Sequence, residues 1–378
     1  MSALRIALVG ACPYPTPQGS QVYLRGMARA LAEAGQDVTV VAYAHGTGGA
    51  DPGVRVVRGP ALPGYARTRS GPDPAKPALD LALARVLAGV DGDVWHAHGH
   101  EGMGVALLAR ALRRARGAQA PPLVYTPHTR FGEELPTYLR GASWSHVALR
   151  SALATLGAAS DRRLPAHADA CVALSARSAT HLRAHGGRVL ATVTPGLFPE
   201  DVSPRAPLPP RPTVVYAGNP DAYQDLHVLT AAMLTLRATH GPGAPRLRLV
   251  GASWRSADGR AVAALADEVI DTPTWPVARA AIARAHVAVV PRTRCAGFPV
   301  KLLTAVALGV PAVVAEGSAQ GLPGEVVVPN GDARALAEAL LRTATTPPVV
   351  DTDALWRTCA WSVQVRALLE AYRAVRAG

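Results

Sequence analysis

The residues best suited to chemistry lie in the segment 297–316 and just before it. The pattern there predicts a loop, a helix over residues 299–308 with Pro299 at the first helical position, a turn at Gly309, and a second buried strand. Lys301 then falls in the first turn of that helix, where the helix dipole disfavours a cation unless an anion is bound nearby. Because ligands of parallel sheets bind at the carboxyl ends of the strands, this position favours a phosphate-bearing ligand.

Two arginines add to the positive charge of this region. Arg292 and Arg294 directly follow the expected strand Val287–Val290, and their planar guanidinium groups suit the oxygens of a phosphate. We therefore expect Arg292, Arg294 and Lys301 to converge on one diphosphate. The alternative is that Lys301 simply extends its ammonium group into solvent.

The same segment resembles the donor-binding signature of glycosyltransferases with the GT-B fold, in particular family 4. That signature reads Glu-Gly-Phe-Gly, an apolar tripeptide, and then Glu-Ala-Met-Ala-x-Gly-x-Pro-Val-Val. The positions that match are Gly297, Phe298, Leu302, Ala305, Ala307, Gly309, Pro311 and Val313. The family's two glutamates correspond to Ala296 and Thr304. The resemblance implies that Gly297 and Phe298 contact the sugar donor, and that Thr304 gives a weaker hydrogen bond in place of the ribose-binding glutamate.

A second part of the resemblance covers the segment 217–226. The family there has Gly-Arg-x-x-x-x-Lys-Gly, whose arginine and lysine neutralise the diphosphate. This chain has Asn219 in place of the arginine and Gln224 in place of the lysine. The resemblance implies that Gly218, Asn219 and Gln224 bind the donor, with the lost positive charge moved to the cations that follow residue 290. Asp221 and Gln224 also form a capping-box pattern, so the alternative is that this segment only starts a helix.

The loop after the first expected strand, residues 13–20, leads into a helix expected over residues 21–34. A loop with glycine at a helix start offers free backbone amides to an anion. In the resembled family this loop closes over the donor phosphate and the acceptor, which assigns Gly19 and Ser20 to donor binding here. The alternative is that Ser20 only caps the helix.

Three histidines lie at and just beyond the end of the expected strand Val94–His98. His96, His98 and His100 alternate, so an extended chain would place their side chains on one face, where they could bind a metal. A helix expected to begin at Glu101 interrupts that geometry, and the similar strand end of the family, Asp-Val-Val-His-Ala-His, holds no metal. We therefore expect no metal site, and place His98 among the residues that bind the acceptor.

His128 follows the next expected strand, Leu123–Thr126, at the carboxyl end where ligands bind. In the resembled family the histidine of a similar Thr-x-His strand end faces the transferred sugar, which makes His128 the candidate catalytic residue. A buried structural histidine is the alternative. The loop beyond it contains Arg130, Glu133 and Glu134, which we expect to bind the acceptor and to supply any general base.

Short apolar strands alternate with helical patterns along the chain, which predicts an α/β protein with parallel sheets covered on both faces. Six prolines over residues 198–212 exclude regular structure and indicate a linker. The fold implied by the resemblance is GT-B, with two Rossmann-like, doubly wound domains that face a central cleft. The expected domains are 1–197 for the acceptor, 213–350 for the nucleotide sugar, and a C-terminal helix over 351–378 that crosses back to the first domain.

The expected elements fall into two sets. The strands expected in the first domain are Ile6–Val9, Val38–Ala42, Val54–Val57, Val94–His98, Leu123–Thr126, Ala170–Leu174 and Val189–Thr194. Those expected in the second are Thr213–Gly218, Leu247–Gly251, Val287–Val290, Ala312–Ala315 and Val326–Val328. The side chains expected to return the terminal helix to the first domain are Trp356, Trp361, Leu368, Leu369 and Tyr372.

The composition describes a globular protein with excess positive charge. Of 378 residues, 49% are hydrophobic and 17% are charged. The formal charge of +12 divides into +8 over residues 1–200 (21 basic, 13 acidic) and +4 over residues 201–378 (18 basic, 14 acidic). This excess favours anionic partners such as nucleotide diphosphates or acidic lipid surfaces, and no nucleic-acid-binding module is recognisable. Scattered cysteines and the lack of a signal or membrane-spanning pattern predict a cytoplasmic protein with peripheral contact at the inner membrane face.

The function implied by the resemblance is transfer of a sugar from a nucleotide-diphosphate sugar, which serves as co-substrate. The sequence does not identify the acceptor, which is a glycan, a lipid or a small molecule. Chemistry in the family is usually retaining and needs neither a metal nor another cofactor. Loss of two glutamates and two cations supports an alternative, a catalytically silent GT-B protein that acts as a partner or glycan-binding module.

Overall fold

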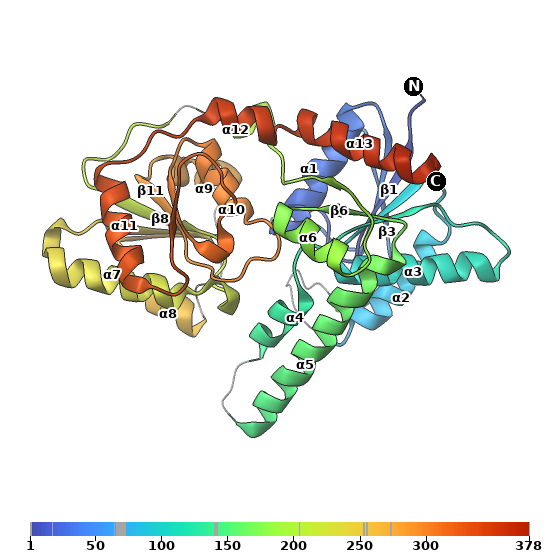
Figure 1. Ribbon diagram of the computed structural model, residues 1–378, viewed down its shortest axis with the longest axis horizontal. Coiled ribbons are helices and arrows are strands. Elements are labelled where there is room, and N and C mark those ends of the chain that lie inside the picture. The colour runs from blue at the N-terminus through green and yellow to red at the C-terminus, as the bar shows by residue number, and fades with distance from the viewer. Residues whose placement is uncertain are drawn as a thin grey trace. The chain divides into compact units, whose positions relative to one another are not determined.

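The computed structural model describes most of the chain as two compact units. Residues 1, 17, 64, 66–72, 140–142, 204, 252, 253, 255, 273 and 378 lie outside the described residues, and with them Pro17 of the expected phosphate loop and Pro204 of the expected linker. The first unit is Met1–Gly196 together with Trp361–Gly378, and the second is Leu197–Ala360 (Figure 1). Among the described helices, none has the length and apolar character needed to cross a membrane.

The first unit is built on a seven-stranded parallel sheet with the strand order β3-β2-β1-β4-β5-β6-β7. Its strands are β1 (Arg5–Gly10), β2 (Asp37–Ala42), β3 (Val54–Arg58), β4 (Val94–His98), β5 (Leu123–Thr126), β6 (Ala170–Ala173) and β7 (Val189–Thr192). The central strands are almost wholly apolar, because parallel strands covered on both faces must bury nearly every side chain. In β1, all residues after Arg5 are buried. The doubly wound α/β class is therefore confirmed.

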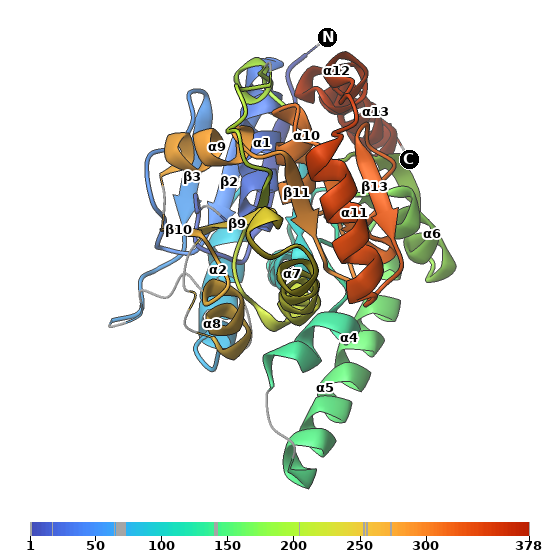
Figure 2. The ribbon, with the colours of Figure 1, turned by 90° about the vertical axis from the view of Figure 1, so that its left-hand side faces the viewer.

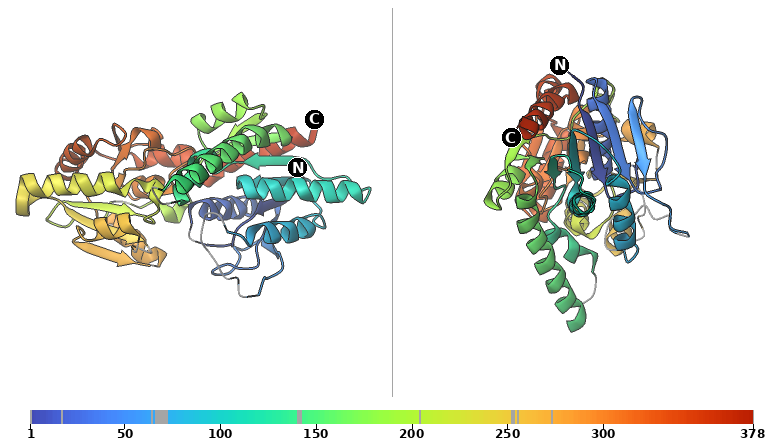
Figure 3. Two further views of the ribbon diagram at one scale, coloured as in Figure 1. Left: turned by 90° about the horizontal axis from the view of Figure 1, so that it is seen from below. Right: turned by 90° about the vertical axis from the view of Figure 1, so that its right-hand side faces the viewer.

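Helices cover both faces of this sheet. They are α1 (Gly19–Glu33), α2 (Lys76–Leu87), α3 (Gly99–Ala115), α4 (Phe131–Glu134), α5 (Trp144–Arg163), α6 (Ala176–Ala184) and α13 (Trp361–Ala377), with 3₁₀ turns at Leu135–Tyr138 and Leu164–His167. One face packs with α2, α3 and α6 into a core that contains the fully buried Trp95. Helices α1 and α13 contact each other and lie on the sheet as well, and α2 and α3 run side by side (Figures 1 and 3).

The second unit repeats this plan with six parallel strands in the order β10-β9-β8-β11-β12-β13. Its strands are β8 (Thr213–Ala217), β9 (Arg246–Gly251), β10 (Glu268–Asp271), β11 (Val287–Val290), β12 (Ala312–Ala315) and β13 (Glu325–Val328). Its helices are α7 (Leu226–His240), α8 (Ala257–Ala263), α9 (Trp275–Ala283), α10 (Val300–Ala307), α11 (Ala333–Thr345) and α12 (Thr352–Cys359). Neighbouring strand residues face opposite sides, so Val214 packs with α7 and α11, whereas Val215 packs with α9 and α10 (Figure 2).

Several elements differ from the sequence expectation. The segment 198–212 contains one 3₁₀ turn, Pro199–Asp201, and falls within the second unit. The terminal segment forms two helices, α12 and α13, which separate at Ala360, where the chain makes an isolated bridge with Leu197. Trp356 belongs to α12 and packs against the core of the second unit.

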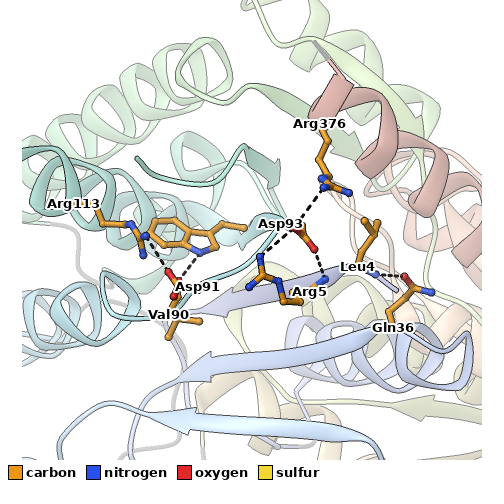
Figure 4. A network of polar contacts seen from close by, with 9 residues as sticks. Leu4, Arg5, Gln36, Val90, Asp91, Asp93, Arg113 and Arg376 are labelled. Carbon is orange, nitrogen blue, oxygen red and sulfur yellow. Dashed lines mark hydrogen bonds and ion pairs between the residues drawn. The ribbon is translucent and has the colours of Figure 1, made fainter. Parts of the chain in front are cut away.

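Helix α13 lies beside the start of the chain, where Figure 4 shows the polar contacts. The carboxylate of Asp93 accepts hydrogen bonds from the backbone N–H of Arg5 at 2.8 Å and from its guanidinium at 3.4 Å. The same carboxylate pairs with Arg376 of α13 at 3.6 Å. Arg113 pairs with Asp91 close by, at 3.0 Å. Exposed ion pairs of this kind add little to the free energy of unfolding. The pair between Asp93 and Arg376 therefore orients α13 more than it stabilises its packing.

A buried hydrogen-bond chain holds α13 more firmly. The hydroxyl of Tyr372 lies 2.6 Å from Nδ1 of His96, and Nε2 of His96 lies 2.8 Å from Oγ1 of Thr126. The hydroxyl of Thr126 donates to the carbonyl of Val172 at 3.0 Å. Because that hydrogen is used, His96 must donate through Nε2 and accept through Nδ1 from Tyr372. Burial lowers the pKa of His96 to about 3, so the ring stays neutral.

Replacing Tyr372 tests this chain. In Tyr372→Phe, Nδ1 of His96 loses its donor while it stays buried, and we expect the free energy of unfolding to fall by about 1–3 kcal/mol, measured by urea denaturation. Tyr14→Phe is the matched control, because Tyr14 is also fully buried but its hydroxyl has no hydrogen-bond partner among the described residues. Equal losses in the two variants would show that the contact with His96 does not hold α13.

Candidate donor-binding site and the histidines of the first unit

The candidate donor-binding residues of the second unit meet around the ammonium group of Lys301. Lys301 is the second residue of α10, because Pro299 is the N-cap residue and not the first helical residue. Its Nζ donates to Oε1 of Gln224 at 2.7 Å and to the hydroxyl of Tyr216 at 3.0 Å. The side chain therefore turns inward, and the alternative that it extends into solvent is wrong.

Gln224 and Asn219 belong to the same network. Nε2 of Gln224 donates to Oδ1 of Asn219 at 3.2 Å, and Nδ2 of Asn219 donates to the carboxylate of Asp221. The hydroxyl of Tyr216 donates to the carbonyl of Asn219 at 2.6 Å. Asp221 precedes the 3₁₀ turn Ala222–Gln224, but its side chain makes no cap hydrogen bond, so the capping box was wrong. The side-chain amides of Asn219 and Gln224 instead hold in place the groups that surround Lys301.

Because Gly218 has no side chain, it leaves the space that the ammonium group of Lys301 occupies. Gly218 follows β8 with φ +142°, and a Cβ built there would lie 2.9 Å from Nζ of Lys301 and 3.4 Å from the hydroxyl of Tyr216. Any larger residue would push the ammonium group away from its two acceptors. The resemblance picked out Gly218, and the structure supplies the physical reason for it.

The two arginines after β11 behave differently from each other. Nε of Arg292 donates to the carbonyl of Arg294 at 2.6 Å, and the Arg292 guanidinium lies 4.6 Å from the ring centroid of Tyr223. Arg292 is close enough to Lys301 for its charge to lower the pKa of the lysine. Arg294 is exposed, and its backbone carbonyl accepts the hydrogen bond from Arg292. The structure therefore brings Arg292, and not the guanidinium of Arg294, toward Lys301.

Near neutral pH, Lys301 is divided between its neutral amine and its ammonium form. Burial, and after it the charge of Arg292, lowers the pKa of Lys301 to about 7. A neutral amine has two N–H groups, and here both have acceptors, Gln224 and Tyr216. Protonation adds a third N–H, so an anion that accepts from it would raise the pKa of the lysine again.

The remaining candidate donor-binding residues of the second unit lie on α10 and just before it. Thr304 is partly buried three residues after Lys301, which places both side chains on the same side of the helix. Gly297 is buried. Phe298 packs against the apolar core beneath α10, which suits a residue that positions the loop.

Sequence reasoning missed the two tyrosines and the residues that brace the Arg292 loop. Asp225 has a left-handed backbone, φ 53°, and its carboxylate accepts from the backbone N–H and the hydroxyl of Thr293 at 2.8 and 2.7 Å. The hydroxyl of Ser318 donates to the carbonyl of Arg292 at 2.7 Å. Tyr216 and Tyr223 lie in the same short segment as Gly218 and Gln224, which was the available signal for them.

In the first unit, His98 and His128 lie together at the carboxyl ends of β4 and β5. Nδ1 of His98 is 3.2 Å from Nε2 of His128, and Nε2 of His98 is buried with no partner among the described residues. Burial lowers the pKa of His128 to about 4 and holds the pKa of His98 well below its usual value. The ring of Tyr23 lies 5.5 Å from that of His128, and its hydroxyl donates to the carbonyl of Val193. Both imidazoles are therefore neutral at physiological pH.

The three alternating histidines point to different partners. His96 bonds Tyr372 and Thr126, His98 meets His128, and Nε2 of His100 lies 2.6 Å from the carboxylate of Asp161. His100 belongs to α3 and not to an extended strand, so the three side chains do not share a face. Within the described ranges, no group of three His, Cys, Asp or Glu residues is placed to hold a metal.

The expected acceptor residues beyond β5 are paired locally. The guanidinium of Arg130 forms an ion pair with Glu133 at 2.9 Å, and the hydroxyl of Tyr138 donates to the carboxylate of Glu134 at 2.6 Å. All of these side chains belong to α4 and its flanking residues, and the structure joins none of the three to His98 by a described contact.

At the start of α1, Gly19 is the first helical residue and Gln18 is the N-cap residue. Ser20 is therefore the second helical residue, and its hydroxyl donates to the side-chain oxygen of Gln21 at 2.8 Å. The alternative that Ser20 caps the helix is wrong. Gly19 and Ser20 still lie at the helix start, where backbone N–H groups have no partner within the helix.

Two family models match the sequence in line with this architecture. Residues 17–201 match Glycosyltransferase Family 4, and residues 211–346 match Glycosyl transferases group 1. Two parallel α/β units with these matches define a glycosyltransferase of the GT-B class. The chain belongs to the GT-B glycosyltransferases, as its resemblance implied. No curated protein matches the sequence.

Solved structures share the fold over nearly the whole chain. Sucrose-phosphate synthase from Thermosynechococcus elongatus has a TM-score of 0.75 at 20% identity, over 98% of this chain and 99% of that one. The α,α-trehalose 6-phosphate synthase from Burkholderia multivorans has a TM-score of 0.70 at 15% identity, over 100% and 99%. Anabaena HepE, in complex with UDP and glucose, has a TM-score of 0.66 at 16% identity, over 97% and 99%. At these identities the similarity shows the fold alone.

Replacing Gly218 tests whether Lys301 depends on the space that this glycine leaves. Gly218→Ala places a methyl group against Nζ and requires an unfavourable φ, so we expect the free energy of unfolding to fall by about 1–3 kcal/mol in urea denaturation. Gly243→Ala is the control in the same unit, because a Cβ there meets nothing within 4 Å. If both variants are as stable as the wild type, the lysine is not confined as described.

Proposed function

We propose that this protein transfers a sugar from a nucleotide-diphosphate sugar, bound by the second unit, to an acceptor bound by the first. The observation that carries the proposal is the ammonium group of Lys301, held at the start of α10 by Gln224 and Tyr216. Structures of similar fold support a nucleotide diphosphate as the ligand: Anabaena HepE was solved in complex with UDP-glucose, and Arabidopsis starch synthase IV bound to ADP and acarbose.

In the proposed reaction, the bond between the anomeric carbon and the β-phosphate oxygen breaks, and an acceptor hydroxyl oxygen bonds to that carbon. The acceptor's proton passes to the departing phosphate, so no protein nucleophile is needed and the stereochemistry is retained. Negative charge grows on the leaving diphosphate, where the third N–H of Lys301, the first N–H groups of α10 and the charge of Arg292 stabilise it. These cations fill the role that a metal has in other transferases.

We assign the remaining roles by the same proposal. His128, as a neutral imidazole, bonds a hydroxyl group of the transferred sugar, and Gly297, Phe298 and Thr304 line the donor. The acceptor side comprises His98, Arg130, Glu133 and Glu134, and its ligand is a glycan, a lipid or a small molecule. The reaction belongs in the cytoplasm, where nucleotide sugars are made, with nucleic acid excluded as a partner.

Proton uptake on nucleotide binding tests the donor assignment. At pH 8 the amine of Lys301 is mostly neutral, because its pKa is about 7, whereas a bound diphosphate favours the ammonium form. Binding of UDP-, GDP-, TDP- or ADP-sugars, whose diphosphate has no group that titrates near neutral pH, should therefore take up nearly one proton at pH 8 and almost none at pH 6. The measurement is calorimetry in buffers that differ in ionisation enthalpy.

Two lysine variants complete that experiment. Lys301→Met should abolish the proton uptake and weaken nucleotide binding roughly ten-fold to a hundred-fold, the value of a charged hydrogen bond. Lys76→Met is the matched control, because Lys76 lies in the first unit, where it pairs with Glu101 at 2.9 Å. Tight binding by Lys301→Met, or binding at pH 8 with no proton uptake, would reject the proposed site.

A second candidate function is a catalytically silent partner or glycan-binding module. It is favoured by one observation: Gln224 and Tyr216 satisfy the amine of Lys301 internally, so the network is complete with no ligand. The positions of the family's two glutamates, Ala296 and Thr304, carry no charge. Calorimetry discriminates between the two functions, since a silent module would bind none of the four nucleotides or their sugar conjugates.

A further inference from the structure

Helix α5 of the first unit packs along only part of its length. Its buried residues, Gly157 and Asp161, lie in the C-terminal half, where the backbone of Gly157 approaches Phe131 of α4. Every residue from Ser143 to Leu149 is exposed. Figures 1 and 3 show α5, in green, running out beyond the other helices of its unit. The N-terminal half of this helix is therefore held away from the rest of the first unit.

The base of α5 is fixed by a buried carboxylate. Asp161 accepts from Nε2 of His100 at 2.6 Å and from the backbone N–H groups of Phe131 and Gly132, each at 2.9 Å. These bonds lower the pKa of Asp161, so the carboxylate stays ionised. The projecting half thus continues a helix that is anchored at its other end.

Between Trp144 and Leu156, the outer face of α5 carries no charge. At 3.6 residues per turn, the side facing away from Asp161 is formed by Ser145, Ala148, Leu149, Ala152, Thr155 and Leu156, with Trp144 at its edge, and all seven are exposed. Trp144 is 85% exposed, Leu149 50% and Leu156 66%. Large apolar side chains that lie together on a protruding surface usually mark a binding site.

Positive charge lies at the C-terminal end of this outer face. Residues 143–160 include no Asp or Glu, and Asp161, the one acid of α5, is bonded to His100. The last turn of the helix adds Arg162 and Arg163, both exposed. The excess charge of the chain also lies mainly in residues 1–200, +8 of +12. An anionic partner therefore fits this surface better than a neutral or cationic one.

We propose that the outer face of α5 docks on the surface of an anionic lipid bilayer. An interfacial helix buries its apolar face at the boundary between headgroups and acyl chains, and tryptophan prefers that depth. Trp144, Leu149 and Leu156 enter this boundary, while Arg162 and Arg163 lie among the lipid phosphates. The proposal is independent of the proposed sugar transfer.

A second copy of the chain fits this face less well. From Trp144 to Leu156 the helix rises only about 18 Å, and a strip about 10 Å wide covers roughly 200 Å². A stable protein interface buries about 800 Å² on each partner. A bilayer needs no matching area, because it accommodates any protruding apolar side chain.

Vesicle binding by the full chain tests the proposal. We expect the wild type to sediment with vesicles of phosphatidylcholine and phosphatidylglycerol in equal parts, and not with phosphatidylcholine alone. The triple variant Trp144→Gln, Leu149→Gln, Leu156→Gln should lower the partition coefficient about ten-fold or more, because it removes the apolar contacts and keeps the charge. Circular dichroism confirms that its helix content is unchanged.

The matched control replaces the same residue types elsewhere. Leu108→Gln, Leu234→Gln, Trp275→Gln changes side chains that are 38%, 52% and 52% exposed, and should bind mixed vesicles like the wild type. No binding by the wild type, or equal binding by the α5 variant, overturns the proposal. A dimer in sedimentation velocity without lipid that the α5 variant abolishes also overturns it, in favour of a second copy. Nucleotide calorimetry on the same samples reports separately on the donor site.

Discussion

The constraint on which the candidate donor site depends is an ammonium group taken out of water at the start of a helix. The two hydrogen bonds that Lys301 donates go to neutral acceptors, Gln224 and Tyr216. Burial and, after it, the charge of Arg292 lower its pKa to about 7. The helix dipole also disfavours a cation at this position. Gly218 leaves the space, and the fixed amides of Asn219 and Gln224 hold the geometry. Positive potential is thus concentrated at one point that an anion can neutralise.

Burial has different effects on the ionisable side chains at the strand ends of the two sheets. At the strand ends of the first unit, His98 and His128 lose their charge, because burial and the neighbouring imidazoles disfavour a second proton. At the strand ends of the second unit, a lysine stays close to its protonation midpoint. A neutral imidazole can donate to or accept from a hydroxyl group, whereas an ammonium group suits a phosphate. These properties suit the roles proposed for His128 with a sugar hydroxyl and for Lys301 with a diphosphate.

Much of the fold could be predicted because buried parallel strands have continuous apolar sequences. Val94–His98 and Val287–Val290 were predicted to the residue, and Gly309 has the positive φ, 69°, that a helix end requires. Strand β10 and helix α5 were missed, because β10 is largely exposed and the apolar side chains of α5 face outward. The direction of Lys301 could not be predicted, since its acceptors lie 77 and 85 residues away in sequence.

The departures from the family pattern are physically coupled. A glutamate at position 304 would stand three residues after Lys301 on α10, within reach of its ammonium group. Such a carboxylate would raise the pKa of the lysine and occupy its third N–H. With Thr304 in that place, no carboxylate of α10 competes for the ammonium group, which also lies 4.3 Å from the ring centroid of Tyr216. Cations at 219 and 224 would repel the same buried ammonium group, whereas Asn219 and Gln224 support it. The four replacements together therefore leave Lys301 among neutral side chains at positions 219, 224 and 304.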